Sequence, residues 1–459
     1  MQESKVQFNM KIAVIGAGIS GLSTAHFLKK GGAEVTVLEK NSGPGGTIGT
    51  KFVDGYLVEN GPNSTSETNF VIDELLSDLS ISGEKVYADE ASKFRFILRN
   101  GKLYALPSGP GSFISTRLWT LGGKLRLFAE PFIGRAEYEE SIADFVTRRL
   151  GGEFLDYAIN PFVAGVYAGN PSDLSVRAAF PKLYALEEKY GGLLKGTIGG
   201  ARERKKRGTK AKASAKLFAF RSGMGILPAT IAKEFAGSIR YGAAVESVKK
   251  GQTGFVVGYS LNGVLDSEVY DAVVLSTPAF AAASIVKSWL PELSSELAKI
   301  KYPPVAVAVL GYKREQVRID LKGFGFLVPE VEDRKILGTI WSSSIFPDRA
   351  PAGFVEFTTF VGGSRQPKLA ALSNEEIAKI AHEENASLMK IEGAPAFRAV
   401  SKWDRAIPQY NIGHLSILDA VRHVESLHKG FYICSNYKDG ISVADCIANG
   451  KQTAQTILT

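Results

Sequence analysis

A short glycine-rich segment, GAGISG at residues 16–21, restricts the possible folds of this chain more than any other feature. A β-branched run, KIAVI at residues 11–15, precedes it and is interpreted as a buried strand. Residues 23–30 follow with helical periodicity, and a second apolar run at residues 34–38 ends at Glu39. Strand, tight turn, helix, strand and acid in this order are typical of a dinucleotide-binding βαβ unit.

The three glycines, the start of the helix and the acid each meet a separate requirement of nucleotide binding. Gly16 permits the tight turn after the strand, Gly18 lets the backbone approach a pyrophosphate, and Gly21 lets the helix pack closely on the sheet. The N-terminus of the helix supplies free N–H groups to the phosphates. Glu39, 23 residues after Gly16, is placed to accept hydrogen bonds from a ribose.

A second glycine-rich turn favours FAD over NAD. It occupies residues 41–49 directly after the acid, and its Gly45-Gly46 pair predicts another backbone approach to the diphosphate. Residues 61–63 then form a rigid Gly-Pro-Asn turn. The FAD is expected to be noncovalent, because no His or Cys lies in an attachment context near the second turn. The cofactor-binding residues predicted from these turns are Gly16, Ala17, Gly18, Ile19, Ser20, Gly21, Glu39, Lys40, Gly45, Gly46, Thr47, Gly61, Pro62, Asn63 and Ser64.

The charge of the chain does not predict a nucleic-acid partner. The formal net charge is +8, and residues 202–216 alone hold eight Lys or Arg and one Glu. The rest of the chain is therefore close to neutral, so the basic pI reflects one local run. Two interpretations of that run stay open, a solvated loop and a contact with anionic lipid headgroups.

Cysteine and histidine usage argues against a disulfide framework and against a metal site. The two cysteines, Cys434 and Cys446, fit a reducing compartment, and the five histidines show no ligand spacing. The N-terminal residues are too short and polar for a signal peptide, and no stretch of about twenty apolar residues occurs. We expect a cytoplasmic protein, or one bound peripherally to the inner face of the cell membrane.

Further blocks of sequence narrow the family. They include FAFRSGMGILP at 218–228, WDRAIPQYNIGH at 403–414 and YICSNYKDGISVADCIANG at 432–450. Together with the glycine turns, these blocks resemble the protoporphyrinogen oxidase family, oxygen-dependent flavoenzymes of haem and chlorophyll synthesis with coproporphyrinogen-oxidising relatives. The IPQY block argues against an amine oxidase, and a non-catalytic flavin-binding module has no support beyond the nucleotide motif.

The resemblance implies an α/β fold of the amine-oxidase-like, two-domain flavoenzyme type, with a Rossmann-like FAD domain, a mixed-sheet substrate domain and a helical membrane-associating domain. The helical part mixes aromatic, aliphatic and basic residues, as an interfacial helix or an ordinary amphipathic core helix would. The expected bounds are 10–84, 217–285 and 405–459 for the FAD domain, 85–104 and 286–404 for the substrate domain, and 105–216 for the helical domain with its basic loop at 202–216.

The resemblance also extends the cofactor site. It places the backbone of Val245 against the adenine, and residues 239–249 and 271–278 are expected as strands returning to the nucleotide sheet. The segment Gly440, Ile441, Ser442 and Val443 is expected to open a helix whose N–H groups and dipole stabilise negative charge on the pyrimidine end of the flavin.

The function implied is oxidation of protoporphyrinogen IX to protoporphyrin IX by hydride transfer to N5 of FAD, with O₂ as acceptor and H₂O₂ as product. Coproporphyrinogen III oxidation to coproporphyrin III stays open as the alternative. Arg95 is the expected propionate anchor, Leu327 and Phe346 the expected pocket walls, and Asn63 an orienting residue; no catalytic acid or base is assigned. A homodimer, a hand-off to ferrochelatase and a peripheral membrane contact are further expectations.

Overall fold

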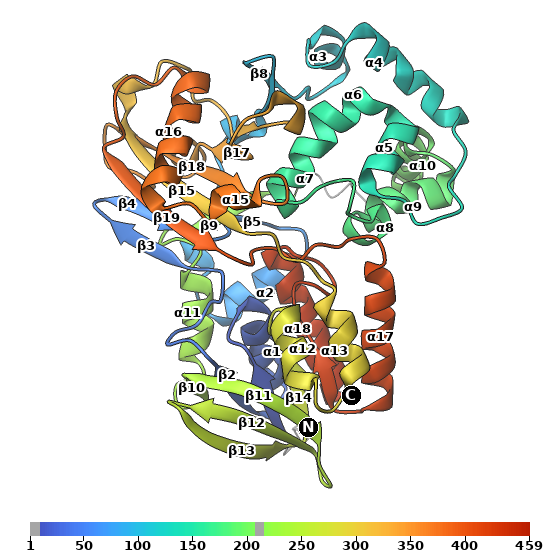
Figure 1. The fold of residues 1–459 in the computed structure, drawn as a ribbon, viewed down its shortest axis with the longest axis vertical. Coiled ribbons are helices and arrows are strands. Elements are labelled where there is room, and N and C mark those ends of the chain that lie inside the picture. The colour runs from blue at the N-terminus through green and yellow to red at the C-terminus, as the bar shows by residue number, and fades with distance from the viewer. Residues whose placement is uncertain (1–9, 207–214) are drawn as a thin grey trace.

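The computed structural model describes residues 10–206 and 215–459 and has three parts (Figure 1). A sheet with helices on both faces forms the lower part, a second sheet forms the upper left part, and short helices form the upper right part. The basic loop expected at 202–216 is wrong in part, because residues 202–206 belong to helix α10 (Leu193–Lys206), while residues 207–214 lie outside the described residues.

The lower part is built on a five-stranded sheet in which every neighbouring pair is parallel. Its strands, in spatial order, are β10 (Ile239–Tyr241), β2 (Glu34–Glu39), β1 (Lys11–Ile15), β14 (Ala272–Leu275) and β20 (Phe431–Ile433). The predicted strand, helix and strand at the N-terminus are confirmed as β1, α1 (Ile19–Lys30) and β2.

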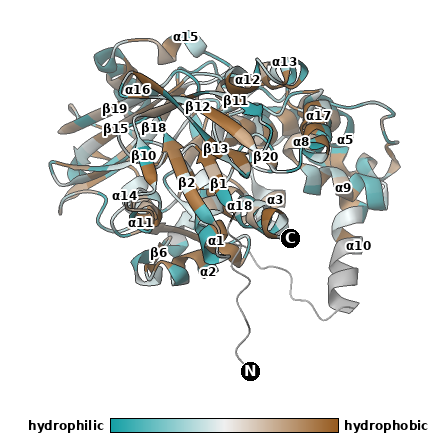
Figure 2. Ribbon diagram, turned by 90° about the horizontal axis from the view of Figure 1, so that it is seen from below, coloured by the Kyte–Doolittle hydropathy of each residue, from teal (hydrophilic) through white to brown (hydrophobic). Residues whose placement is uncertain are grey.

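Helices cover both faces of this sheet, as the continuous apolar strands require. Ile12 and Val14 of β1 pack into one core, while Ala13 and Ile15 pack into the other. The first core is closed by α1, α2 (Val71–Asp78), α11 (Ile226–Lys233) and α18 (Val443–Leu458). The second is closed by α12 (Ala279–Val286), α13 (Pro291–Ala298), α17 (His414–Leu427) and a three-stranded antiparallel sheet of β11 (Ala243–Lys250), β12 (Phe255–Leu261) and β13 (Val264–Tyr270). The apolar stretches of the central strands are brown in Figure 2.

One strand expectation is wrong in part. Residues 239–249 were expected to return as a whole to the nucleotide sheet, but only β10 does so, and β11 belongs to the separate antiparallel sheet. Gly242 lies between them with φ of +74°, a left-handed conformation that turns the chain out of the first sheet. The second expected strand, β14, pairs with β1 as predicted.

The upper left part contains a seven-stranded mixed sheet. Its strands, in spatial order, are β19 (Phe397–Trp403), β15 (Val305–Lys313), β18 (Phe354–Gly362), β17 (Gly338–Ile340), β16 (Gly325–Leu327), β7 (Arg95–Arg99) and β8 (Lys102–Ala105). Only β16 and β7 pair in parallel. The helices that pack on it are α14 (Ser342–Ile345), α15 (Pro367–Ala370) and α16 (Asn374–Met389).

Two small sheets connect the lower and upper parts. The hairpin of β3 (Thr50–Val53) and β4 (Tyr56–Glu59) lies against the mixed sheet, where the ring of Tyr56 stacks on Phe397 at 4.3 Å. The second sheet contains β5 (Thr65–Ser66), β9 (Leu217–Phe220) and β6 (Lys85–Tyr87).

The upper right part is helical, as the resemblance implied. Its helices are α3 (Pro110–Ser115), α4 (Leu121–Arg126), α5 (Ile142–Leu150), α6 (Gly152–Phe154), α7 (Asn160–Tyr167), α8 (Val176–Ala179), α9 (Pro181–Tyr190) and α10 (Leu193–Lys206). Arg149 of α5, fully buried, donates to Glu130 at 3.2 Å and to Glu187 at 2.6 Å. Glu130 also accepts from the backbone N of Leu193 at 2.7 Å, so this buried network holds the segment before α5 against α9 and α10. Within the described ranges, no helix combines the length and the apolar character needed to cross a membrane.

Candidate functional site

The first glycine turn lies at the carboxyl end of β1, where α1 begins. The backbone N of Gly16 donates to the carbonyl oxygen of Leu38 at 2.8 Å, which joins the turn to β2. Gly18 is the N-cap of α1, and no acidic residue stands in the first helical turn. The positive end of the helix dipole is therefore free to favour an anion.

Gly18 and Gly21 are required for different reasons. A Cβ on Gly21 would clash with the carbonyl oxygen of Gly16, so the protein itself demands glycine there. A Cβ on Gly18 would meet nothing within 4 Å and would project into open space at the start of α1. Glycine at position 18 is thus unnecessary for packing, and the space beside it fits a diphosphate.

Glu39 is buried at the end of β2 and ties the first turn to the residues that follow the strand. Its Oε2 accepts from the backbone N of Ala17 at 2.7 Å, and its Oε1 accepts from the backbone N of Asn41 at 2.9 Å and from Asn41 Nδ2 at 2.7 Å. Of the roughly four lone-pair sites of a carboxylate, one on Oε2 remains for a ribose. The pattern did not reveal this additional structural role of Glu39. Lys40, the next residue, is exposed.

The second glycine turn packs directly against the first. The backbone N of Gly45 donates to the carbonyl oxygen of Ala17 at 2.8 Å, and Gly45 forms a parallel bridge with Gly18. Gly46 and Thr47 are exposed beside it. The two turns, separated in sequence by residues 22–40, therefore border the same open space at the helix N-terminus.

The predicted helix opening near the C-terminus starts at Val443. Ser442 caps α18 by accepting from the backbone N of Asp445 at 3.1 Å. The backbone N of Gly440 donates to the hydroxyl of Tyr410 at 3.1 Å. The backbone N–H of Gly440, one of the groups expected to face the flavin, therefore already has a hydrogen-bond partner within the protein. Val245, the expected adenine contact, is half-buried at a bulge of β11.

Asn63 lies at the edge of a small internal cavity of about 10 Å³. Its Nδ2 donates to the carbonyl oxygen of Gly61 at 3.2 Å, and its Oδ1 accepts from the Thr358 hydroxyl at 3.5 Å. The cavity is lined by Leu57, Glu59, Asn63, Ser64, Phe324, Ile340, Ser342, Ile345, Phe346, Arg349 and Glu356.

Three buried ionisable residues, Glu59, Arg349 and Glu356, line this cavity, and the sequence reasoning predicted none of them as site residues. Arg349 Nη1 lies 3.3 Å from Glu59 Oε1, which also accepts from the backbone N of Met224 at 2.8 Å. Burial raises the pKa of Glu356 to about 8, an effect that Glu59 reinforces and Arg349 opposes. Neither Arg349 nor Glu356 lies in a recognised motif. The acid within FVEFTTF at 354–360 was nevertheless a usable signal, because an ionisable group in a strand of this kind is buried only with partners or a shifted pKa.

The expected substrate residues fall in two places. Phe346 is buried and lines the cavity with Asn63. Arg95 is exposed on β7, and its guanidinium carbon lies 5.2 Å from the ring centre of Phe324, which also lines the cavity. Leu327 is half-buried on the neighbouring strand β16 and packs toward α7. Phe324 thus connects the predicted anchor with the cavity.

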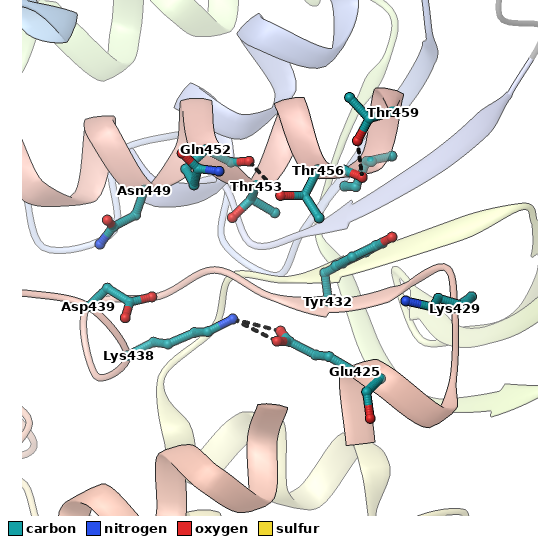
Figure 3. A pocket seen from close by; sticks show the side chains of 12 residues that line it. Glu425, Lys429, Tyr432, Lys438, Asp439, Asn449, Gln452, Thr453, Thr456 and Thr459 are labelled. Atoms are coloured by element: carbon teal, nitrogen blue, oxygen red, sulfur yellow. Dashed lines mark hydrogen bonds and ion pairs between the residues drawn. The ribbon is translucent and has the colours of Figure 1, made fainter. Parts of the chain in front are cut away.

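A larger hollow of about 600 Å³ lies elsewhere, between the end of α17, β20 and α18 (Figure 3). Its lining is polar, and Lys438 Nζ donates to both carboxylate oxygens of Glu425, at 2.7 and 2.9 Å. It contains none of the predicted site residues. Within residues 10–206 and 215–459, no cluster of three or more His, Cys, Asp or Glu side chains could hold a metal ion.

Known proteins are similar to this chain along almost its whole length. A family model for flavin-containing amine oxidoreductases matches residues 19–458. Protoporphyrinogen oxidase 2, chloroplastic/mitochondrial, of Arabidopsis thaliana is 32% identical, over 98% of this chain and 94% of the relative. The chain belongs to the protoporphyrinogen oxidase family. Coproporphyrinogen III oxidase of Bacillus subtilis (strain 168) is 29% identical, over 98% of both chains. A solved structure from Exiguobacterium sp. 255-15 has the same fold, with a TM-score of 0.81 at 21% identity and 98% coverage of each chain.

Membership in the protoporphyrinogen oxidase family makes FAD the cofactor, and the residues present fit it. The open space beside Gly18, the start of α1 without an acidic residue and the remaining lone pair on Glu39 Oε2 suit a diphosphate with its ribose.

Proposed function

We propose that the protein oxidises protoporphyrinogen IX to protoporphyrin IX, with O₂ as electron acceptor and H₂O₂ as product. The observation that carries this proposal is the similarity to a plant protoporphyrinogen oxidase over nearly the whole chain, together with a glycine-turn site that fits FAD. When bound, FAD supplies the two-electron acceptor for the substrate.

The protein's own part in this reaction is to hold and orient the macrocycle. Arg95 would pair with a propionate through its planar guanidinium, which suits a carboxylate better than an ammonium does. Phe346 and Leu327 would supply apolar walls, and Asn63 would orient the substrate or the flavin at the Gly61–Asn63 turn. The proposal also keeps the three expected domains. These are the FAD domain (10–84, 217–285 and 405–459), the substrate domain (85–104 and 286–404) and the helical domain (105–216).

Coproporphyrinogen III is the second candidate substrate, favoured by the similarity to the Bacillus enzyme. The deciding experiment is aerobic turnover of both porphyrinogens side by side, followed by porphyrin fluorescence. We expect the higher kcat/KM with protoporphyrinogen IX. Exclusive turnover of coproporphyrinogen III would replace the main proposal with the second, and turnover of neither would contradict both.

We further propose that the protein binds peripherally to anionic lipid headgroups on the inner face of the cell membrane. The segment 110–132, called the apolar segment below, exposes large hydrophobic side chains together with basic residues, as an interfacial segment does. Its exposed hydrophobic residues are Ile114, Leu121, Leu125, Phe128 and Phe132. A homodimer and a hand-off of product to ferrochelatase are proposals that rest on the family alone.

A further inference from the structure

Tyr410, a buried residue just before α17, holds the loop that leads from β20 into α18. This loop, residues 434–442, is called the α18 entry loop below. The Tyr410 hydroxyl donates to the carbonyl oxygen of Asn436 at 2.6 Å and accepts from the backbone N of Gly440 at 3.1 Å. A tyrosine hydroxyl can do both at once, because it has one proton to donate and lone pairs to accept. Tyr410 therefore closes the entry loop between Asn436 and Gly440.

His414, the first residue of α17, holds the same loop at the next backbone carbonyl. Its ring stacks on Tyr410 with the ring centres 4.3 Å apart, and its Nε2 lies 2.9 Å from the carbonyl oxygen of Tyr437. A carbonyl oxygen only accepts, so Nε2 carries the proton. Burial lowers the pKa of His414 to about 4, so the imidazole is neutral at ordinary pH. A buried and uncharged pair of rings thus fixes the position of the entry loop.

The backbone next to Tyr410 is attached to the helical part of the molecule. The carbonyl oxygen of Tyr410 accepts from the backbone N of Ser175 at 2.8 Å. Glu139 accepts from the backbone N of Gly413 at 3.0 Å through Oε2 and from the Ser175 hydroxyl at 2.6 Å through Oε1. Tyr410 is therefore bonded on its backbone side to the helical part and on its side-chain side to the entry loop.

The entry loop lies on the same side of the parallel sheet as the first glycine turn. It follows the carboxyl end of β20, and the glycine turn follows the carboxyl end of β1, so both leave the same edge. The helices α1 and α18 also run in parallel. Gly450 of α18 packs against Ser23 of α1, and Gly31, directly after α1, packs against Leu458. The N-termini of α1 and α18 therefore point to the same side, each with N–H groups that have no intrahelical partner.

We propose that Tyr410 is a positioning residue that fastens the α18 entry loop to the helical part and so aims the start of α18 at the flavin. The inference rests on the proposed function in one respect, the place of residues 440–443 against the flavin. Tyr410 acts through the loop, because its hydroxyl is occupied by Asn436 and Gly440. Without that hydroxyl, both backbone groups lose a partner inside the protein, and the loop shifts to find others.

The first experiment compares Tyr410→Phe with wild type. It measures the dissociation constant for FAD and the reduction potential of the bound flavin. The phenyl ring keeps the stack on His414, and only the hydroxyl is removed. We expect FAD to bind about 5- to 30-fold more weakly, as for the loss of one or two neutral hydrogen bonds. The reduction potential should become more negative, because a helix start that is less well aimed stabilises negative charge on the reduced flavin less.

The matched control is Tyr437→Phe, the same change within the entry loop. Tyr437 is fully buried, and its hydroxyl has no hydrogen-bond partner among the described residues, so its removal breaks no hydrogen bond. This variant should keep the wild-type affinity for FAD and the wild-type reduction potential. Wild-type values in Tyr410→Phe, or equal shifts in Tyr410→Phe and Tyr437→Phe, would overturn the proposal.

A second pair of variants tests the attachment to the helical part, and it stays decisive if Tyr410→Phe does not fold. Glu139→Ala removes the acceptor of Gly413 and Ser175, so it should move the reduction potential in the same direction. Its effect should be smaller in a Tyr410→Phe background, since both changes loosen one connection. Glu137→Ala, at an exposed residue that makes neither contact, should behave as wild type. An unchanged potential in Glu139→Ala would overturn the attachment of the loop to the helical part.

The positioning role and the proposed function can fail separately. Both measurements require bound FAD but no porphyrinogen, so they test Tyr410 even if neither porphyrinogen is turned over. Normal porphyrinogen turnover by wild type, together with a wild-type reduction potential in Tyr410→Phe, would reject the positioning role and leave the proposed function intact.

Discussion

Gly18 is the residue at which the cofactor assignment can be tested most directly. Because a Cβ there meets no protein atom, Gly18→Val should fold normally and still exclude the diphosphate. We expect purified Gly18→Val to lack flavin absorbance while keeping its far-ultraviolet circular dichroism. Gly21→Ala is the contrasting variant, which should lose stability because its Cβ would clash with the Gly16 carbonyl. Full flavin content in Gly18→Val would contradict the site.

Arg95 tests the proposed propionate anchor. A contact made in both the ground and the transition state affects mainly KM, so Arg95→Ala should lower kcat/KM by about 10- to 150-fold with kcat less changed. Arg95→Lys should recover only part, because lysine lacks the planar fork. Arg318→Ala, at another exposed arginine paired with Glu392 at 2.6 Å, is the control and should behave as wild type. Unchanged kinetics in Arg95→Ala on both porphyrinogens would place Arg95 outside the substrate site.

Glu356 should also leave a mark on stability. Burial raises its pKa to about 8 from an ordinary 4.5, so the folded protein holds a proton that the unfolded chain releases between these values. Stability from this group is therefore present at low pH and is lost as the pH rises toward 8. Glu356→Gln should gain in melting temperature relative to wild type as the pH increases. Because the pKa of Glu59 is also raised, the melting temperature of Glu356→Gln should still fall somewhat as the pH increases. A difference in melting temperature between Glu356→Gln and wild type that does not change with pH would show that Glu356 does not titrate in this range.

At the scale of elements, the apolar segment (110–132) allows a direct test of the proposed membrane contact. Phe128 and Phe132 are 74% and 88% exposed, and each basic residue near an anionic surface adds about 1 kcal/mol. We expect salt-sensitive flotation with vesicles containing anionic lipid, weakened at least about tenfold in a Phe128→Ser/Phe132→Ser double variant. Phe52→Ser is the control, because Phe52 is 73% exposed on β3. Equal flotation of the control and the double variant would exclude this segment as the contact.

For the whole molecule, the cofactor site joins parts of the chain that are far apart in sequence. The first two glycine turns come from the N-terminal region, whereas the expected flavin end includes the start of α18. Because FAD binds only the folded arrangement, each tenfold excess of FAD over its Kd should add about 1.4 kcal/mol to the stability. Thermal unfolding followed at increasing FAD concentration measures this gain. A melting temperature independent of FAD would contradict a site assembled by folding.

The nucleotide-binding unit could be predicted from the sequence because its determinants are local. Glycines at fixed spacing, apolar strands and the helix between them all lie within residues 11–46, and β1, α1 and β2 formed there. The turn at Gly242 was missed, because one glycine in a strand-like run does not reveal whether the chain leaves the sheet. The cluster around the cavity was decided only by tertiary structure. Asn63 and Thr358 are 295 residues apart, and Glu59 and Arg349 are 290 apart. No local pattern records such a pairing, since burial and partner choice arise only when the hairpin β3–β4 packs against the mixed sheet.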